Sequence, residues 1–166
     1  LECVVRSILE RLKRDGKPLP PVAMAGGFAT EDQVYKGLAL GSPYVGLIAL
    51  GRASMAAAFA GRNVGESLRK GVVPKEYSRF GSSVEELFAD LRLLKSSYGD
   101  DAAGIPTGAI GVFSYLHRVA DGLRMLMALN RKFALRYIAR DDIVPLTDEA
   151  ARATGLATYA ELLDRA

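Results

Sequence analysis

The sequence predicts an α/β fold in which one strand–helix–strand unit is followed by a mostly helical extension. Two short apolar runs, residues 21–25 and 44–50, are separated by a segment long enough for one helix. Uninterrupted apolar runs of this length are typical of parallel strands covered by helices on both faces, so we expect both strands to be buried. Beyond residue 53 the apolar residues recur at helical spacing, and no third strand is evident.

The elements around the two strands have clear start and stop signals. Residues 2–14 carry one apolar stripe and predict a helix that ends before Gly16. Thr30 begins the helix between the strands, because Gln33 lies three residues later and completes a capping box. Its inward face is expected to include Val34, Tyr35 and Leu38, and Gly41-Ser42-Pro43 ends it.

The rest of the chain is predicted to be helices and loops. A small-residue helix starts near residue 53, and residues 62–81 form an extended loop. Ser82-Ser83 followed by Glu85-Glu86 forms a doubled capping box, which predicts a helix over 84–98. The longest helix is expected over 109–140, and Thr147 and Thr158 begin two short closing helices. The apolar seam of the long helix consists of Val112, Leu116, Val119, Leu123, Leu126, Phe133 and Tyr137, with one polar interruption at Asn130.

Composition excludes several classes of partner and site. The net charge is only +3, too small an excess to indicate nucleic-acid binding. No apolar run approaches the roughly 18 residues of a membrane span. Cys3 is the single cysteine, which rules out a multi-cysteine metal site and fits a reducing compartment. We therefore expect a cytoplasmic protein with no nucleic-acid partner, no membrane span and no metal.

Both predicted strands end in glycine. Gly26-Gly27 follows the first strand, and Gly51-Arg52 follows the second. Glycines leave backbone N–H groups open to close approach, and the helix N-termini that come next attract anions. The carboxyl ends of neighbouring parallel strands meet at one edge of a sheet, so the sequence predicts an anion site there, with Arg52 as a fixed cation.

Two glycine loops separated by one short helical connection match the phosphate site that (β/α)8 barrels build after their seventh and eighth strands. The expected fold is therefore the C-terminal portion of a TIM barrel, its last two βα units, followed by the helical extension. Residues 1–62 are assigned to helix six, strand seven, helix seven, strand eight and the start of helix eight. Residues 63–146 are the loop and helical extension, and residues 147–166 the short C-terminal helices.

The stretch "AGGFATEDQVYKGLALGSPYVGLIALGRA" (residues 25–53) resembles the end of the FMN-binding barrel of the glutamate synthase family. A looser similarity continues through "GIPTG" at 104–108 and the helix after it. The resemblance implies FMN as the cofactor, with its phosphate held by Gly26, Gly27 and Phe28 after one strand and by Gly51 and Arg52 after the other.

The resemblance also implies a reaction in which reduced FMN delivers a hydride to the imine formed from 2-oxoglutarate and ammonia. The catalytic residues stay unknown, because they are expected on the loops of the first six strands. The family's iron–sulfur cluster is excluded within this chain, since no cysteine follows Cys3. The implied partners are N-terminal barrel strands from a longer protein or a homo-oligomer, together with an amidotransferase or an electron-donor protein.

Two other interpretations stay open. One is a different phosphate-binding barrel enzyme, such as a nucleotide dehydrogenase or a flavin-dependent isomerase or oxidase. The other is a non-enzymatic helical assembly module whose glycines only turn the chain. Outside the glycine loops, His117 and Cys3 are expected to be packing residues, and Asp141 and Asp142 to face water.

Overall fold

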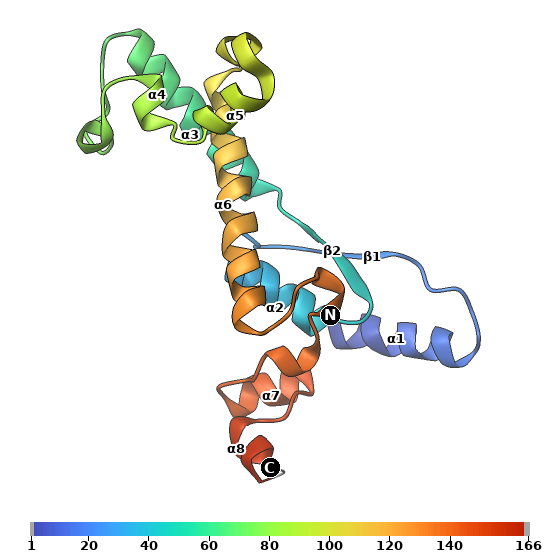
Figure 1. Cartoon of the computed structure of the whole chain (residues 1–166). Helices are drawn as coiled ribbons and strands as arrows, with labels where there is room; N and C mark the ends of the chain where they lie inside the picture. Colours follow the sequence, from blue (N-terminus) through green and yellow to red (C-terminus); the bar gives the residue numbers. More distant parts are fainter. Residues whose placement is uncertain (1, 165–166) are drawn as a thin grey trace. The chain divides into compact units, whose positions relative to one another are not determined.

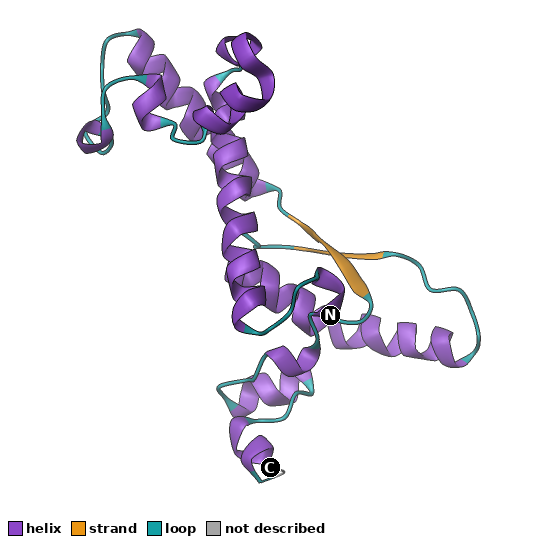
Figure 2. Cartoon of the chain, in the orientation of Figure 1, coloured by secondary structure: helices purple, strands orange, loops and turns teal. Residues whose placement is uncertain are grey.

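In this computed structural model, which describes residues 2–164, the chain is a mixed α/β protein in which helices predominate (Figures 1 and 2). Two short parallel strands form the sheet. The elements are α1 (Glu2–Arg14), β1 (Val22–Ala25), α2 (Glu31–Gly41), β2 (Val45–Ala49), α3 (Arg52–Arg69), α4 (Val84–Leu87), α5 (Leu91–Tyr98), α6 (Thr107–Leu129), α7 (Asp148–Thr154) and α8 (Tyr159–Leu163). Short 3-10 turns lie at Ser78–Phe80, Gly99–Gly104, Leu135–Tyr137 and Arg140–Asp142.

The chain forms two compact units. The first contains residues 1–49 and 122–166, and the second runs from Leu50 to Asp121. The boundaries expected after residues 62 and 146 differ from these divisions, and the first of them falls inside α3, which continues to Arg69. None of the helices described is long and apolar enough to cross a bilayer.

In the first unit, α2 packs on the sheet through a close approach at Gly37. A Cβ there would lie 2.7 Å from the ring of Phe28 and 3.1 Å from the Cδ1 of Ile48, so a larger residue would push the helix away. The expected inward face of this helix is confirmed, because Val34, Tyr35 and Leu38 are all buried. The contact with β2 is made at Gly37, whereas Tyr35 of the buried face lies beside Asp142.

The sheet itself is not buried. No residue of either strand is fully buried, and Leu47 in the middle of β2 is 64% exposed. The expectation of strands covered on both faces is therefore wrong for the described residues. The physical reason is that a cavity of about 300 Å³ lies between α1 and β1, while α2 approaches β2 closely at Gly37.

Two arginines tie the C-terminal end of α2 to the rest of the first unit. Arg6 of α1 donates to the carbonyl oxygens of Leu40 and Ser42 at 2.6 and 2.8 Å, and it pairs with Glu2 at 2.8 Å. Arg140 donates to the same Leu40 carbonyl at 2.9 Å and to the carbonyl of Thr154. Unpaired carbonyls at a helix C-terminus carry partial negative charge, so these cations stabilise the end of α2.

In the second unit, α3 and α6 cross in contact at small residues. A Cβ at Gly61 would lie 2.5 Å from the carbonyl oxygen of Thr107, and one at Gly111 would lie 2.6 Å from that of Ala57. Backbone thus packs directly on backbone at this crossing. The buried core of the unit lies beside it, around Phe88, Leu91, Leu94 and Ile110.

Three predicted helices have different bounds in the structure. The helix that begins near residue 53 continues into the expected loop of residues 62–81 and ends at Arg69. The helix expected over 84–98 is two helices, α4 and α5, although its capping box at Ser83 and Glu86 is confirmed. The long helix ends at Leu129, and Arg131 with φ 55° marks the break.

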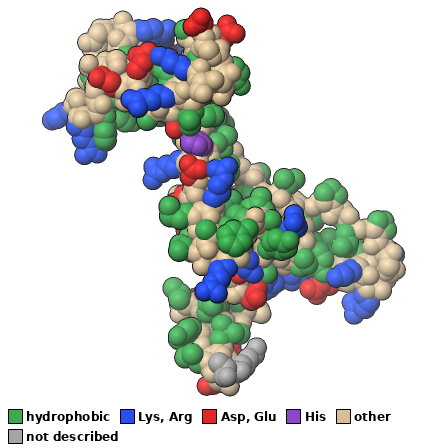
Figure 3. All heavy atoms as spheres, in the orientation of Figure 1, with side chains coloured by type: hydrophobic (Ala, Val, Ile, Leu, Met, Phe, Trp, Pro, Cys, Tyr) green, Lys and Arg blue, Asp and Glu red, His purple; other side chains and the backbone are tan. Residues whose placement is uncertain are grey.

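The predicted seam of α6 is mostly not buried, both within the helix and after its end at Leu129. Val119 is buried, whereas Leu116 is 43% exposed. Phe133 and Tyr137 lie beyond the end of the helix and are 82% and 52% exposed. Regular spacing continued in the sequence after the helical backbone had stopped, so it did not define one face. Hydrophobic side chains are accordingly visible at many points of the surface (Figure 3).

Candidate phosphate site

The carboxyl ends of the two strands lie side by side, as the sequence predicts. Ala25 of β1 pairs with Ala49 of β2 in a parallel register. Gly26-Gly27 follows the first of these residues directly, and Gly51 lies two residues after the second. The first loop and the sheet both belong to the first unit.

Gly26 and Gly27 adopt backbone conformations that only glycine takes easily. Their φ angles are 122° and 73°, both outside the region that L side chains prefer. Nothing lies within 4 Å of the position that a Cβ would occupy at either residue. The backbone here is strained for any other residue, and it is open to approach from outside.

Over residues 27–30, the backbone donors divide into two free and two occupied N–H groups. Gln33 Oε1 accepts from the N–H of Ala29 at 2.8 Å and from that of Thr30 at 3.3 Å, which confirms the predicted reach-back of the capping box. Within residues 2–164, the N–H groups of Gly27 and Phe28 have no hydrogen-bond partner. These two are therefore the donors that an anion can reach.

A shallow cavity of about 320 Å³ lies at the loop. Gly26, Gly27 and Phe28 line it together with Gln33 and Lys36 of α2. Lys36 lines the cavity, although the sequence does not predict it as a site residue. It lies within residues 25–53, the stretch that carries the family resemblance. It lies one helical turn after Asp32, a spacing that the sequence shows but that has an ordinary explanation as a surface ion pair.

Phe28 serves the fold as well as the cavity. Its ring packs against Gly37 of α2, where it closes the interface between helix and loop. Its predicted place in the site therefore rests on its backbone N–H, and the ring holds the loop in position.

Acidic groups compete with an anion at the start of α2. Glu31 and Asp32 both lie in the first turn. A hydrogen bond from the Thr30 hydroxyl, followed by one from Lys36, lowers the pKa of Asp32 to about 2, so its carboxylate is ionised at neutral pH. Lys36 Nζ lies 2.9 Å from that carboxylate and offsets its charge. The favourable field of the helix N-terminus is thus reduced, and the open N–H groups carry most of the attraction for an anion.

Gly51 and Arg52 belong to the second unit, where they begin α3. Gly51 has φ −89°, and its carbonyl accepts from the N–H of Met55 at 3.1 Å. Arg52 is exposed at the first position of the helix. A joint site formed by both glycine loops stays a prediction.

The other polar candidates are accounted for by local contacts. His117 stacks on Phe113 with ring centroids 5.7 Å apart, and its nitrogens lie 3.3 Å from Asp90 and 3.5 Å from Asp121. These contacts give His117 local partners, and its structural role stays a prediction.

Cys3 and Asp142 differ from their expected surroundings. Cys3 is exposed, and its thiol donates to the carbonyl of Ala153 at 3.0 Å. The Asp142 side chain is only 8% exposed and accepts from the N–H of Ala139, with Lys132 at 3.2 Å, so the expectation that it faces water is wrong. The 3-10 turn at Arg140–Asp142 bends this carboxylate back onto the preceding backbone.

No family model, curated protein or solved structure matches this chain. The case for a phosphate site therefore rests on the residues themselves.

Proposed function

We propose that this chain is part of an FMN-dependent oxidoreductase of the glutamate synthase type, in which it supplies loops that bind the cofactor phosphate. The observation that carries the proposal is the pair of unpartnered N–H groups at Gly27 and Phe28. They lie just after a parallel strand, and within the described residues nothing lies within 4 Å of the Cβ positions of Gly26 and Gly27. Such N–H groups are the usual ligands of phosphate at strand-to-helix turns.

The residues of the first loop fit a phosphate. An incoming oxygen would meet only backbone at Gly27, since nothing lies near its Cβ position. Lys36 lines the same cavity, and its flexible side chain would bring the ammonium group to a phosphate bound there. The proposal adds Gly51 and Arg52 as the second half of the site, by analogy with barrels that bind phosphate between two such loops.

The exposed sheet supports the barrel context of this proposal. A two-stranded sheet is marginally stable alone, and Leu47 and the strand edges offer surface to further strands. We infer that barrel strands from a longer protein, or from another copy of the chain, complete the sheet. An amidotransferase or an electron-donor protein would then supply ammonia or electrons.

FMN, once reduced by an electron donor, would supply the hydride that converts the imine formed from 2-oxoglutarate and ammonia to glutamate. The residues of this chain would hold and orient the phosphate end of the cofactor. The N–H groups of Gly27 and Phe28 would donate to phosphate oxygens, and Phe28 would keep the loop rigid against α2. The groups that bind substrate and transfer protons are assigned to other barrel loops.

The test is a comparison of FMN with riboflavin, which lacks the phosphate. The native protein that contains this chain is added to each flavin, and the quenching of flavin fluorescence measures binding. FMN is expected to bind at least tenfold more tightly than riboflavin, because each charge-assisted hydrogen bond contributes about 1.5–3 kcal/mol. Equal affinity for the two flavins would contradict a phosphate site.

A non-enzymatic helical module is the second candidate, and one observation favours it. The ring of Phe28 packs on Gly37, so the loop has a structural reason to turn sharply even without a ligand. A protein that binds neither flavin, nor inorganic phosphate, would support this second function over the first.

A further inference from the structure

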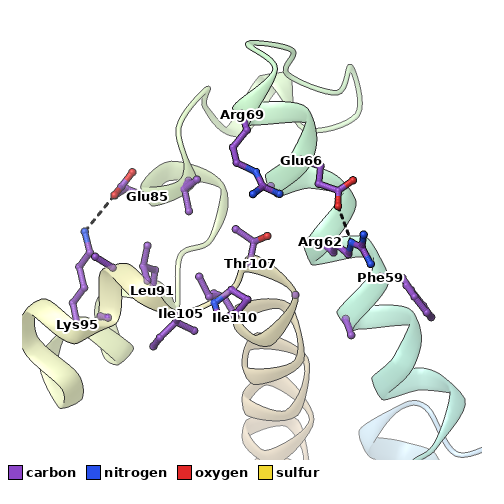
Figure 4. A pocket seen from close by; sticks show the side chains of 17 residues that line it. Phe59, Arg62, Glu66, Arg69, Glu85, Leu91, Lys95, Ile105, Thr107 and Ile110 are labelled. Carbon is purple, nitrogen blue, oxygen red and sulfur yellow. Dashed lines mark hydrogen bonds and ion pairs between the residues drawn. The ribbon is translucent and has the colours of Figure 1, made fainter.

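A large cleft in the second unit is independent of the glycine loops. It lies between the C-terminal half of α3, the start of α4, α5 and the first turn of α6 (Figure 4). Its volume is about 810 Å³, which is within the range of about 300–1,000 Å³ typical of small-molecule sites. The whole cleft is built from residues 58–110 and therefore lies within one compact unit.

The floor of the cleft is apolar and well packed. Leu91, Ala102 and Ile110 line it, and they are only 5%, 2% and 2% exposed. Two of them belong to the buried core of the unit, so the floor is a rigid surface. Phe59 at the side of the cleft is 56% exposed and extends the apolar lining outwards.

Charged side chains surround this floor, and most of them are already paired. Arg62 Nε donates to Glu66 at 2.7 Å, and Lys95 Nζ lies 3.4 Å from Glu85. The pKa of Glu66 is lowered mainly by its hydrogen bond with Arg62, so at neutral pH both members of that pair are charged. The two pairs leave the rim neutral apart from one further cation.

That cation is Arg69. Within the described residues its guanidinium has no hydrogen bond or ion pair, although it lines the cleft. Figure 4 shows Arg69 reaching from the end of α3 into the space above Thr107. Glu66 and Glu85 stand on the same rim, so one negative charge can be accommodated there better than two.

We propose that this cleft binds a small amphipathic monoanion, an apolar chain that ends in a carboxylate. The chain would lie on the floor of Leu91 and Ile110, and the carboxylate would accept hydrogen bonds from Arg69. A planar guanidinium matches a carboxylate in a two-bond arrangement. A phosphate monoester fits less well, because its second charge would face the two glutamates.

Decanoate is the probe for this proposal. Equilibrium dialysis of labelled decanoate against the 166-residue chain, below its micelle-forming concentration, measures binding directly. The chain contains no tryptophan, so Phe59→Trp places a single fluorescent reporter at the cleft. We expect the binding of decanoate measured by dialysis to saturate. The tryptophan emission of Phe59→Trp should change over the same range of decanoate concentration.

The charge of the ligand is tested with a pair of matched variants. Arg69→Gln should weaken decanoate binding about tenfold or more, as expected when one charge-assisted contact is lost. Arg92→Gln removes an exposed arginine of α5 that does not line the cleft, and it should leave binding unchanged. 1-Decanol, which has no charge, should not distinguish Arg69→Gln from the unsubstituted chain.

Three results would overturn the proposal. The first is no saturable binding of decanoate in dialysis. The second is binding without a change in tryptophan emission, which would place the ligand elsewhere. The third is an equal loss in both arginine variants, which would indicate non-specific attraction. Since the test uses no flavin and no residue of the glycine loops, its outcome is independent of the function proposed above.

Discussion

Gly27 combines a backbone angle of φ 73° with an open approach to its N–H group, and this combination makes it the most informative single residue. We expect the affinity of the native protein for FMN to fall in the order wild type, Arg52→Ala, Gly27→Asp. If Arg52 contacts the phosphate as proposed, Arg52→Ala removes one charge-assisted contact, a loss of about ten- to a hundredfold. Gly27→Asp blocks the approach, strains the backbone and adds a repelling charge.

Riboflavin provides the control for this series in fluorescence-quenching titrations. It has no phosphate, so it should hardly distinguish wild type from Arg52→Ala. If Arg52→Ala weakens riboflavin as much as FMN, the arginine stabilises the start of α3 and does not contact the phosphate. Circular dichroism of each variant shows whether the helical content is retained.

The glycine loop and the Thr30 N–H that Gln33 occupies could be predicted from the sequence, whereas Lys36 and the second N–H that Gln33 takes, that of Ala29, could not. Gly26 and Gly27 stand out because a glycine pair directly after an apolar run indicates a turn whose backbone angles other residues avoid. Which of the next N–H groups are free depends on the side-chain geometry of Gln33, which takes two of them. That geometry depends on rotamers, and a sequence pattern does not contain them.

Among the elements, the crossing of α3 and α6 depends on residues without side chains. We expect Gly61→Ala to lower the free energy of unfolding by about 1–3 kcal/mol, the usual cost of overpacking. The added Cβ would lie 2.5 Å from the Thr107 carbonyl oxygen and 3.1 Å from the Gly111 Cα. Backbone atoms cannot rotate away as a side chain can, so this cost exceeds the gain of about 0.5–1 kcal/mol in helix propensity.

Gly104→Ala is the matched control for this prediction. Nothing lies within 4 Å of its Cβ position, and the residue is in the same unit. Its effect should stay within about 0.5 kcal/mol, as for most surface changes. Urea denaturation of both variants measures the difference, and an equal effect of the two would mean that α3 and α6 can separate without cost.

The start of α4 should respond to acid through Glu86. Backbone hydrogen bonds from Ser82, then Ser83, lower the pKa of this carboxyl below its ordinary value of 4.5. A depressed pKa in the folded state contributes stability above pH 4.5, and that contribution is lost as the pH falls through the folded pKa. We expect the exchange protection of the Ser82 and Ser83 N–H groups to decrease as the pH falls through the folded pKa of Glu86, below 4.5.

Glu86→Gln separates this titration from general acid effects. The amide oxygen can still accept from the two N–H groups, but it does not titrate in this range. Hydrogen exchange followed by NMR should show protection that depends on pH in the wild type and is flat in the variant. The same pH dependence in both proteins would assign the effect to other carboxylates.

Start signals in the sequence predicted helix beginnings better than helix ends. The caps at Thr30, Ser83, Thr147 and Thr158 are all found where the sequence places them. The ends of α3 and α6 were missed, because glycines suggested a loop at 62–81 and regular apolar spacing suggested helix after Leu129. In α3 the glycines Gly61 and Gly65 serve packing against α6, a role that only the tertiary partner reveals.

At the scale of the whole molecule, the apolar residues are divided between two units, and within the first unit the elements around the sheet leave its strands partly exposed. The sequence predicts the βαβ order and the mixed α/β class correctly, since both depend on local patterns. It misses the exposure of the strands, because burial depends on what packs against them. Apolar runs in β1 and β2 have the composition of a covered sheet, but within residues 2–164 they pair only with each other.

This mismatch between composition and exposure gives a prediction about association. Leu47 lies in the middle of β2 and is 64% exposed, and the strand edges have no third strand within the described residues. Open edges with apolar side chains favour pairing with other chains. We expect the isolated 166-residue chain to self-associate in sedimentation velocity runs of increasing concentration, and Leu47→Lys to shift the distribution towards monomer.

Leu93→Lys is the control for association through the sheet. Leu93 is 45% exposed on α5 in the second unit. Leu93→Lys therefore makes the same chemical change as Leu47→Lys, but on a helix and not on a strand. If both variants reduce association equally, general surface hydrophobicity drives it and the sheet has no special part. A compact monomer with one cooperative unfolding transition in the unsubstituted chain would contradict the need for further strands. It would also remove the exposed sheet as support for a barrel, leaving the glycine loop to be judged by phosphate binding alone.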